Sequence, residues 1–248
     1  MSTLDYLDQI KQTLQAKGAP GGWLNPPASP QAIKAAEEEM GYDLPDDWRQ
    51  LYAQHNGESG HLGLFLGLPW LPLEEVLVQW RTWKGLEADY AQEGTHFSVP
   101  SGAIRERYVN LGWIPLSHDW GGNHLGVDMA PGVNGVVGQF INFGRDEELK
   151  FVLAQNTADL FRFLAEEIAS ERCQVEDPTE AMSWCDGQNL MGEMRRMPLP
   201  VYQPQRSVQR PAGDLSAWKS ALPGPWPQVI SSPEAFLPVA FSTSSERD

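Results

Sequence analysis

The chain has little of three things: cysteine, basic side chains and long apolar runs. Only two of its 248 residues are Cys, so we predict no disulfide framework and expect a reducing, cytoplasmic environment. No apolar run approaches the ~18 residues that a membrane-spanning helix needs, and the first residues lack the pattern of a secretory leader. The sequence therefore predicts no association with a membrane.

Basic residues are strongly outnumbered by acidic ones. Lys and Arg together number 18 against 33 Asp and Glu, which leaves a net charge of −15. This charge repels phosphate groups, so the sequence predicts no binding to nucleic acid. The same charge favours a basic protein partner, although acidity that serves only solubility explains the composition equally well.

Proline is unevenly distributed along the chain. Ten of the 20 Pro lie in residues 175–248, where they fix φ, remove backbone donors and disfavour helix and sheet. Large apolar side chains in the same stretch argue against a purely disordered tail. We predict a compact domain over residues 1–174 and an extended, Pro-rich appendage over residues 175–248 that lies along the domain or along a partner.

Apolar periodicity and capping residues predict helices in the first third of the chain. Ser29 and Pro30 form a helix start, and Gly41 is typical of a helix end. A carboxylate pair after Pro45 complements the start of a further helix. The predicted helices cover residues 3–17, 30–40, 44–55 and 73–93.

The second half of the domain changes to short apolar runs separated by turn residues. The stretch 61–71 is typical of a strand followed by a turn. Four further strands are predicted at 109–116, 124–129, 135–142 and 149–154, and a closing helix begins at Thr157. The fold class is therefore α+β: a central antiparallel sheet of about five or six strands, flanked by N-terminal helices and one C-terminal helix.

Several short motifs occur in an order that resembles the SUKH superfamily of Smi/Knr-type proteins. The first is a helix opened by Leu-Pro-acidic residues and closed by Asn-Gly, and later motifs lie around an Ile-Pro-Leu and an Asp-Trp-Gly-Gly-Asn segment. The similarity covers residues 28–170. The residues that carry it are Leu44, Pro45, Trp48, Asn56, Gly57, Pro115, Asp119, Gly122, Asn123 and Asp128.

This resemblance implies an α+β fold and a role that is not catalytic and needs no cofactor. In bacteria it implies immunity proteins that bind and neutralise toxins, and in fungi it implies a regulatory hub. The principal hypothesis is a non-enzymatic immunity protein that occludes the active site of a cognate toxin, a basic and nucleic-acid-directed effector. The alternative is a regulatory or scaffolding module that acts on an endogenous protein.

Either hypothesis requires a surface that binds a protein partner. Acidic residues at helix starts and turns, together with a tryptophan beside them, are the candidates, because an aromatic anchor among charges is typical of a binding hot spot. Most of these acids could equally be solvated faces that complement helix dipoles. The candidates are Glu37, Asp46, Asp47, Glu74, Glu75, Trp120, Asp146 and Glu147.

Two groups of residues near His118 could bind a metal or act in catalysis. His118, His124 and nearby carboxylates are ligand types that suit zinc, but their spacing matches no closed zinc pattern. Asp119 and Asp128 could form an acid–base pair if antiparallel pairing brought them together. No nucleophile, phosphate-binding or redox motif is present. The sequence therefore predicts no metal and no catalysis, with a hydrolase at His118–His124 as a remote alternative.

Overall fold

The computed structural model describes residues 1–60, 62–90, 96–175 and 182–184. The chain divides into two units, Met1–Gly213 and Asp214–Asp248, and every described residue belongs to the first. The predicted appendage, 175–248, lies almost entirely outside the described residues. Its extended character and the boundary near residue 175 therefore stay predictions.

Three N-terminal helices follow the predicted bounds closely, and side-chain caps mark the starts of the first two. The helices are α1 (Thr3–Ala16), α2 (Pro30–Met40) and α3 (Asp46–Gln54). The Ser29 side chain accepts a hydrogen bond from the backbone N–H of Ala32 at the start of α2, and Gly41 ends α2 with a left-handed φ of 75°. The capping residues thus position α2 and α3 as a connected pair.

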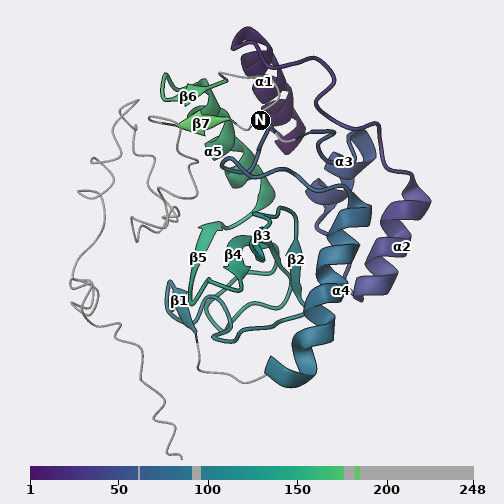
Figure 1. The fold of residues 1–248 in the computed structure, drawn as a ribbon, viewed down its shortest axis with the longest axis vertical. Coiled ribbons are helices and arrows are strands. Elements are labelled where there is room, and N and C mark those ends of the chain that lie inside the picture. The colour runs from purple at the N-terminus through teal and green to yellow at the C-terminus, as the bar shows by residue number, and fades with distance from the viewer. Residues whose placement is uncertain (61, 91–95, 176–181, 185–248) are drawn as a thin grey trace, which may run out of the picture. The chain divides into compact units, whose positions relative to one another are not determined.

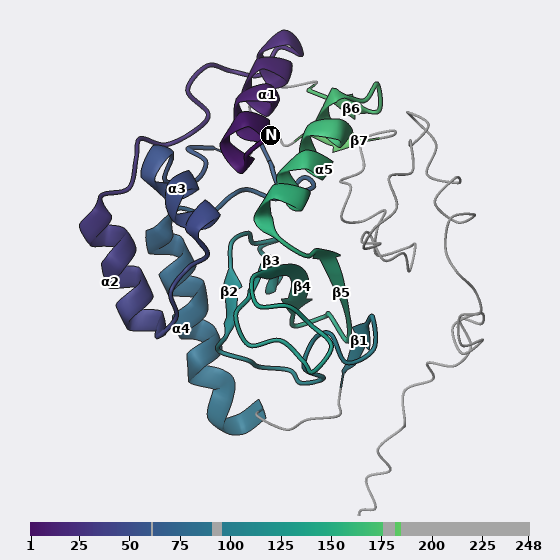
Figure 2. The same ribbon diagram turned by 180° about the vertical axis from the view of Figure 1, so that it is seen from behind.

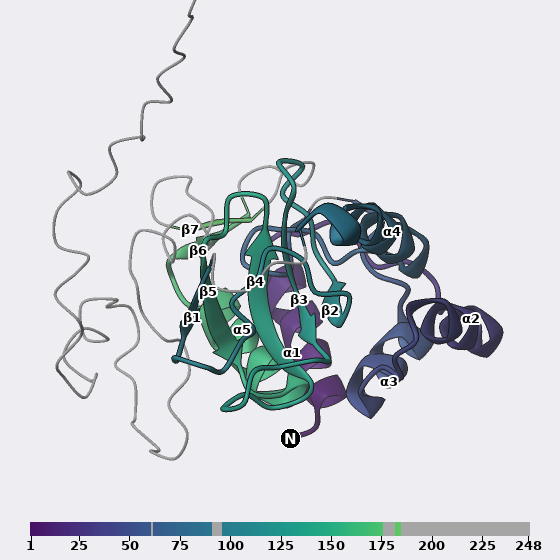
Figure 3. The ribbon, with the colours of Figure 1, turned by 90° about the horizontal axis from the view of Figure 1, so that it is seen from below.

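Two further helices pack against helices that are distant in sequence. Helix α4 (Leu73–Tyr90) lies next to α2, and α5 (Thr157–Ala169) lies alongside α1 although the two are far apart in sequence (Figures 1 and 2). Seen from below, α2, α3 and α4 gather beside strand β2 (Trp113–Pro115), at the opposite edge of the sheet from strand β1 (Phe97–Val99) (Figure 3).

The central sheet has five strands in the order β1-β5-β4-β3-β2. Strands β2, β3 (Asn123–Asp128), β4 (Gln139–Gly144) and β5 (Leu149–Ala154) form an antiparallel meander, as predicted. Strand β1 joins β5 in parallel, so the sheet is mixed at one edge. The α+β class and the central sheet are confirmed.

Both faces of the sheet are covered. On one face Trp48 of α3 packs against Phe65, Phe140 and Phe161, with ring centroids 5.9–6.1 Å apart. On the other face Trp83 of α4 joins a cluster that includes Trp113, Ile141, Phe143 and Val152. Because every residue of β3 and β4 is buried, only the strand ends and their loops reach solvent.

The stretch 61–71 is not the predicted strand. Its described residues form successive turns with a single bridge between Phe65 and Leu68. The reason is a buried carboxylate: Glu58 accepts hydrogen bonds from the backbone N–H groups of Gly63, Leu64 and Trp70 at 2.8–2.9 Å. A side chain therefore replaces the neighbouring strand that these buried donors would otherwise need. We call residues 62–70 with Glu58 the Glu58 turn.

Three short strands were not predicted. Strand β1 has three residues and pairs with a segment about fifty residues later in the chain. Strands β6 (Cys173–Gln174) and β7 (Ser183–Trp184) form a separate two-stranded pair. The described part of the chain contains no helix that is both long and apolar enough to span a bilayer.

Candidate protein-interaction surface

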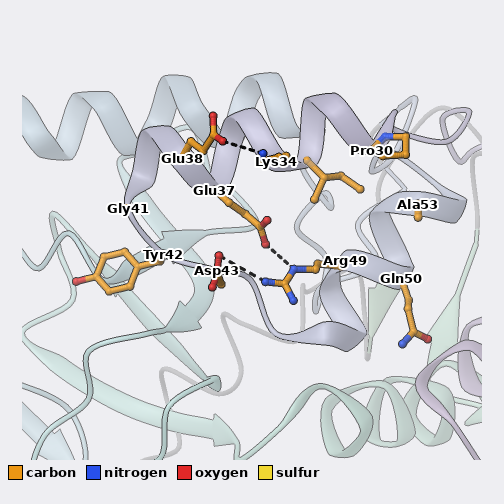
Figure 4. A pocket seen from close by; sticks show the side chains of 11 residues that line it. Pro30, Lys34, Glu37, Glu38, Gly41, Tyr42, Asp43, Arg49, Gln50 and Ala53 are labelled. Carbon is orange, nitrogen blue, oxygen red and sulfur yellow. Dashed lines mark hydrogen bonds and ion pairs between the residues drawn. The ribbon is translucent and has the colours of Figure 1, made fainter.

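An open groove of about 840 Å³ lies between α2 and α3 (Figure 4). The guanidinium of Arg49 is held there by three carboxylates. Its Nε lies 2.7 Å from Glu37, its Nη1 2.8 Å from Asp46 and its Nη2 3.7 Å from Asp43. Arg49 therefore neutralises part of the acidic face that the sequence predicted as a binding surface.

The three predicted partner-binding acids on these helices differ in accessibility. The Glu37 side chain is only 11% exposed, and it also accepts the backbone N–H of Leu44 at 2.7 Å. Asp47 accepts the hydroxyl of Thr3 at 2.6 Å. Asp46 is 85% exposed. The geometry gives Glu37 and Asp47 roles inside the fold and leaves Asp46 turned to solvent.

The start of α4 shows why Asn56 and Gly57 follow α3. The side-chain oxygen Oδ1 of Asn56 accepts the N–H of Leu73, and the Asn56 side-chain amide donates to Glu74 at 3.0 Å. Gly57 has a φ of 73°, and a Cβ there would lie within 2.7 Å of the backbone of residues 70–72. The pair thus ties α3 to the start of α4, where Glu74 is exposed and Glu75 accepts from Gln79.

The other family-motif residues of this region are internal. Leu44 and Trp48 are buried, and Pro45 occupies the N-cap position of α3. Pro115 lies in β2 opposite Gly126. These residues hold α3 and β2 in place and do not face a partner.

The segment 118–123, which we call the Asp119 turn, is organised by one carboxylate. Asp119 Oδ1 accepts the N–H groups of Gly121 and Asn123 at 2.8 and 2.9 Å, and Oδ2 accepts the Asn123 amide at 2.8 Å. Gly122 takes a left-handed φ of 96° inside this turn. The turn is therefore a rigid loop that leads into β3.

Trp120 is the residue that this turn presents. Its φ is 61°, a left-handed conformation that is a true outlier for a bulky side chain. Its side chain is 64% exposed, whereas Trp70, Trp80, Trp83 and Trp113 are all buried. The His118 ring contacts the indole at a centroid distance of 4.8 Å. A rigid loop thus holds a large apolar ring in solvent.

Further aromatic and charged side chains lie at the same end of the sheet, where β3 begins and β4 ends. The Tyr90 and Tyr108 rings contact each other in a tilted arrangement with centroids 5.1 Å apart, and the exposed Phe97 is hydrogen-bonded through its backbone to Glu148. The Asp146 carboxylate, through its hydrogen bonds, raises the pKa of Arg145. We define the Trp120 edge as Tyr90, Phe97, Tyr108, Trp120, Arg145 and Asp146.

The two predicted acids after β4 have different environments. Asp146 is exposed, binds Arg145 at 3.1 Å and accepts the amide of Asn123 at 3.2 Å. Glu147 is buried and accepts the amide of Asn142 at 2.6 Å. Asp146 can therefore contact a partner, and Glu147 cannot do so without opening the β4–β5 connection.

The two histidines of the predicted metal alternative stack on each other with ring centroids 4.9 Å apart. Burial lowers the pKa of His124 to about 4, and burial also lowers the pKa of His118. Over the described residues, no group of three or more His, Cys, Asp or Glu comes together as a metal site. The pair is a neutral part of the packing behind Trp120.

Asp119 and Asp128, which could have formed an acid–base pair, do not come together. Asp119 precedes β3 and Asp128 ends it, so the whole strand separates them, a span of roughly 17–20 Å at ~3.3 Å per residue. Burial raises the pKa of Asp128 to about 6, and its carboxylate accepts the Gln139 amide and the Ala130 N–H. Asp128 therefore secures the far end of the sheet.

Of the six residues of the Trp120 edge, sequence reasoning named Trp120 and Asp146 as candidates and did not name Tyr90, Phe97, Tyr108 and Arg145. No local signal identifies these four, because they come from separate segments of the chain that only the fold brings together. The arrangement offers aromatic rings and a charged pair on a rigid base. Such a surface is suited to binding, since Trp, Tyr and Arg are enriched in interface hot spots.

Comparisons with known proteins place this geometry in context. A family model described as SMI1 / KNR4 family (SUKH-1) matches residues 27–162. Among curated proteins, a glucan synthesis regulatory protein of Neurospora crassa is 32% identical over 186 residues, which cover 60% of this chain and 35% of that protein. The residues that the family model matches include α2, α3, α4, the whole central sheet and the first part of α5.

Two yeast proteins are also similar to this chain. A cell wall biosynthesis/cell cycle regulator of Schizosaccharomyces pombe is 29% identical, covering 60% of this chain and 32% of that protein. A cell wall assembly regulator of Saccharomyces cerevisiae is 27% identical, covering 66% and 40%. The chain thus spans about a third of the length of the curated relatives it matches.

Proposed function

The chain belongs to the SMI1/KNR4 family (SUKH-1), and we propose that it is a non-enzymatic regulatory module that acts by binding an endogenous protein partner. The partner contacts the Trp120 edge. Binding alone is sufficient for regulation, because a nanomolar complex supplies about 12 kcal/mol without any chemical step.

The observation that carries this proposal is the exposed, left-handed Trp120. A left-handed conformation costs a non-glycine residue roughly 1–2 kcal/mol. Burial of the indole does not offset this cost, since the side chain is 64% exposed. Strain of this kind is typical of binding sites, where the surrounding structure over-determines the conformation. Here the Asp119 carboxylate supplies that constraint.

The relatives reported above favour regulation over toxin neutralisation. Each of the three carries a name that describes a regulator, and none of these names describes an immunity protein. Since the chain spans only about a third of each, the activity of those whole proteins is not transferred. The proposal takes from them only the non-enzymatic, regulatory character.

The test is a complementation experiment in the organism that encodes the chain. The gene is deleted and replaced, at its own locus, by tagged versions carrying the native sequence, Trp120→Ala or Val133→Ala. Val133 is the matched control, because it is 95% exposed but lies beyond the opposite end of β3. Phenotype and quantitative co-purification are measured for each strain.

We expect Trp120→Ala to fold normally, to retain a tenth or less of the native partner and to reproduce the deletion phenotype. Val133→Ala should behave as the native sequence. Full complementation by Trp120→Ala would refute the proposal. If the captured protein is instead a toxin that the chain inhibits stoichiometrically, and the deletion only sensitises the cell to it, toxin neutralisation replaces regulation.

A further inference from the structure

We propose that the partner segment recognised at the Trp120 edge is cationic, and that an arginine or lysine side chain of the partner lies on the Trp120 indole beside the carboxylates of Asp119 and Asp146. This inference rests on the proposed function and names the chemistry of its partner. The partner of this surface is therefore a basic protein segment.

The two carboxylates are brought together by one side chain. The Asn123 amide nitrogen donates to Asp119 Oδ2 at 2.8 Å and to Asp146 Oδ2 at 3.2 Å. The backbone N–H of Asp146 in turn donates to the side-chain oxygen Oδ1 of Asn123 at 2.8 Å. Two negative charges therefore lie on either side of a single amide, directly beside the turn that carries Trp120.

Further charged groups lie around the surface. Arg145 donates to Asp146 from Nε and from Nη2, both at 3.1 Å. The charge of Glu148, next to β5, acts on Tyr108 together with that of Asp146. The charge of Glu75, on α4, acts on His118 together with that of Asp119. These carboxylates complement a cationic partner, which would compete with Arg145 for Asp146.

The exposed indole supplies the second half of the site. A guanidinium or ammonium over a Trp face is attracted by the ring, most strongly when the cation is partly desolvated. This chain uses the same contact internally: Lys84 lies 4.9 Å from the ring centroid of Trp80, and Lys150 lies 5.3 Å from that of Trp113. The net charge of −15 would also steer a basic segment towards the protein.

The test uses the full chain and a short fluorescein-labelled peptide of alternating arginine and serine. Its control is the same peptide with citrulline in place of arginine, which keeps the shape and removes the charge. Binding is measured by fluorescence anisotropy at low salt for the native chain and for Trp120→Ala, Asp146→Asn and Arg145→Gln. Asp43→Asn is the matched control, since Asp43 is also an exposed carboxylate that lies near an arginine, in the α2–α3 groove.

We expect Trp120→Ala and Asp146→Asn each to weaken binding of the arginine peptide about tenfold, which corresponds to about 1.4 kcal/mol. Asp43→Asn should leave binding unchanged. Arg145→Gln should tighten binding about threefold, because it removes the native cation that competes for Asp146. The citrulline peptide should not bind.

Several results would overturn the inference. They are equal weakening by Asp43→Asn and Asp146→Asn, no effect of Trp120→Ala, or equal binding of the citrulline peptide. A proline-rich peptide that binds through Trp120 regardless of Arg145 would identify a different class of partner. If Trp120→Ala abolishes regulation in the cell while the arginine peptide fails to bind, the proposed function stands and this inference fails.

Discussion

The Glu58 turn and the Asp119 turn are built alike but differ in exposure. In each, one carboxylate accepts several hydrogen bonds from one short loop, and in each a non-glycine residue has a φ of 61°. Leu66, in the first turn, is 1% exposed, and Trp120, in the second, is 64% exposed. Burial of the side chain offsets the strained backbone at Leu66, whereas most of the Trp120 side chain stays in solvent.

A loop organised by one carboxylate thus has two different roles in this protein. The Glu58 turn completes the core, since Phe65 and Trp70 within it pack on Trp48. In the Asp119 turn, the His118 ring contacts the edge of an indole that stays exposed to solvent. Packing in the core explains the strain at Leu66, whereas the strain at Trp120 accompanies an exposed side chain and so points to binding.

The largest difference is expected when the two carboxylates are removed. Glu58→Ala leaves three buried N–H groups without an acceptor, and each such loss costs about 1–3 kcal/mol; the total should be about 4 kcal/mol. Asp119→Ala should cost only about 1 kcal/mol, because water can reach the half-buried Asp119 turn. Urea denaturation of both variants measures this, and equal losses would contradict the comparison.

Loss of the Leu66 side chain should also destabilise the fold more than loss of the Trp120 side chain. Leu66→Ala removes a buried side chain and should lower the free energy of unfolding by about 3 kcal/mol. Trp120→Ala should change it by less than about 0.5 kcal/mol, as is usual for exposed positions. The measurement is again urea denaturation, with Val133→Ala as the exposed control. A large loss at Trp120 would mean that its ring serves stability.

The carboxylates should also give the two turns different pH dependence. Burial raises the pKa of Glu58 from 4.5 to about 7 in the folded protein. Between these values the unfolded chain has released a proton that the folded protein keeps, so stability falls as pH rises. The effect should be on the order of 2 kcal/mol, below the full ~1.4 kcal/mol per unit of pKa because a charged carboxylate can relax.

Comparison with Glu58→Gln isolates this titration, because His96, His124 and Asp128 titrate equally in both proteins. The stability advantage of the native chain over Glu58→Gln should be largest near pH 5 and should shrink by pH 8. If the advantage grows as pH rises, Glu58 is ionised in the folded protein throughout. The stabilisation of its carboxylate by the three N–H groups would then exceed the desolvation cost of burying it.

Most of the fold could be predicted because its signals are local. Ser29 and Gly41 mark the ends of α2, and the Gly- and Asn-rich turns separate β2 to β5, so these elements lie within a few residues of the predicted bounds. The Glu58 turn could not be predicted. Its apolar run is typical of a strand, and only tertiary structure shows that a buried carboxylate satisfies its backbone.

The candidate surface was predictable only in part. Residue type indicated Trp120 and Asp146, but the same reasoning also selected Glu37 and Glu147, which bond within the fold. Exposure of an acidic residue depends on whether a donor from another element reaches it. Arg49 reaches Glu37 from α3, and no feature of the sequence near Glu37 reveals this.

The smallest effect concerns the strained backbone itself. Trp120→Gly should be more stable than Trp120→Ala by about 1 kcal/mol, because glycine adopts a left-handed φ without the steric cost that alanine has. Leu66→Gly should show the same gain over Leu66→Ala yet stay well below the native chain, since its buried side chain is lost. Trp120→Gly should equal or exceed native stability and bind no partner. A glycine variant less stable than the alanine variant at position 120 would show that the left-handed conformation is not strained, and the conformational argument for a binding role at Trp120 would then be lost.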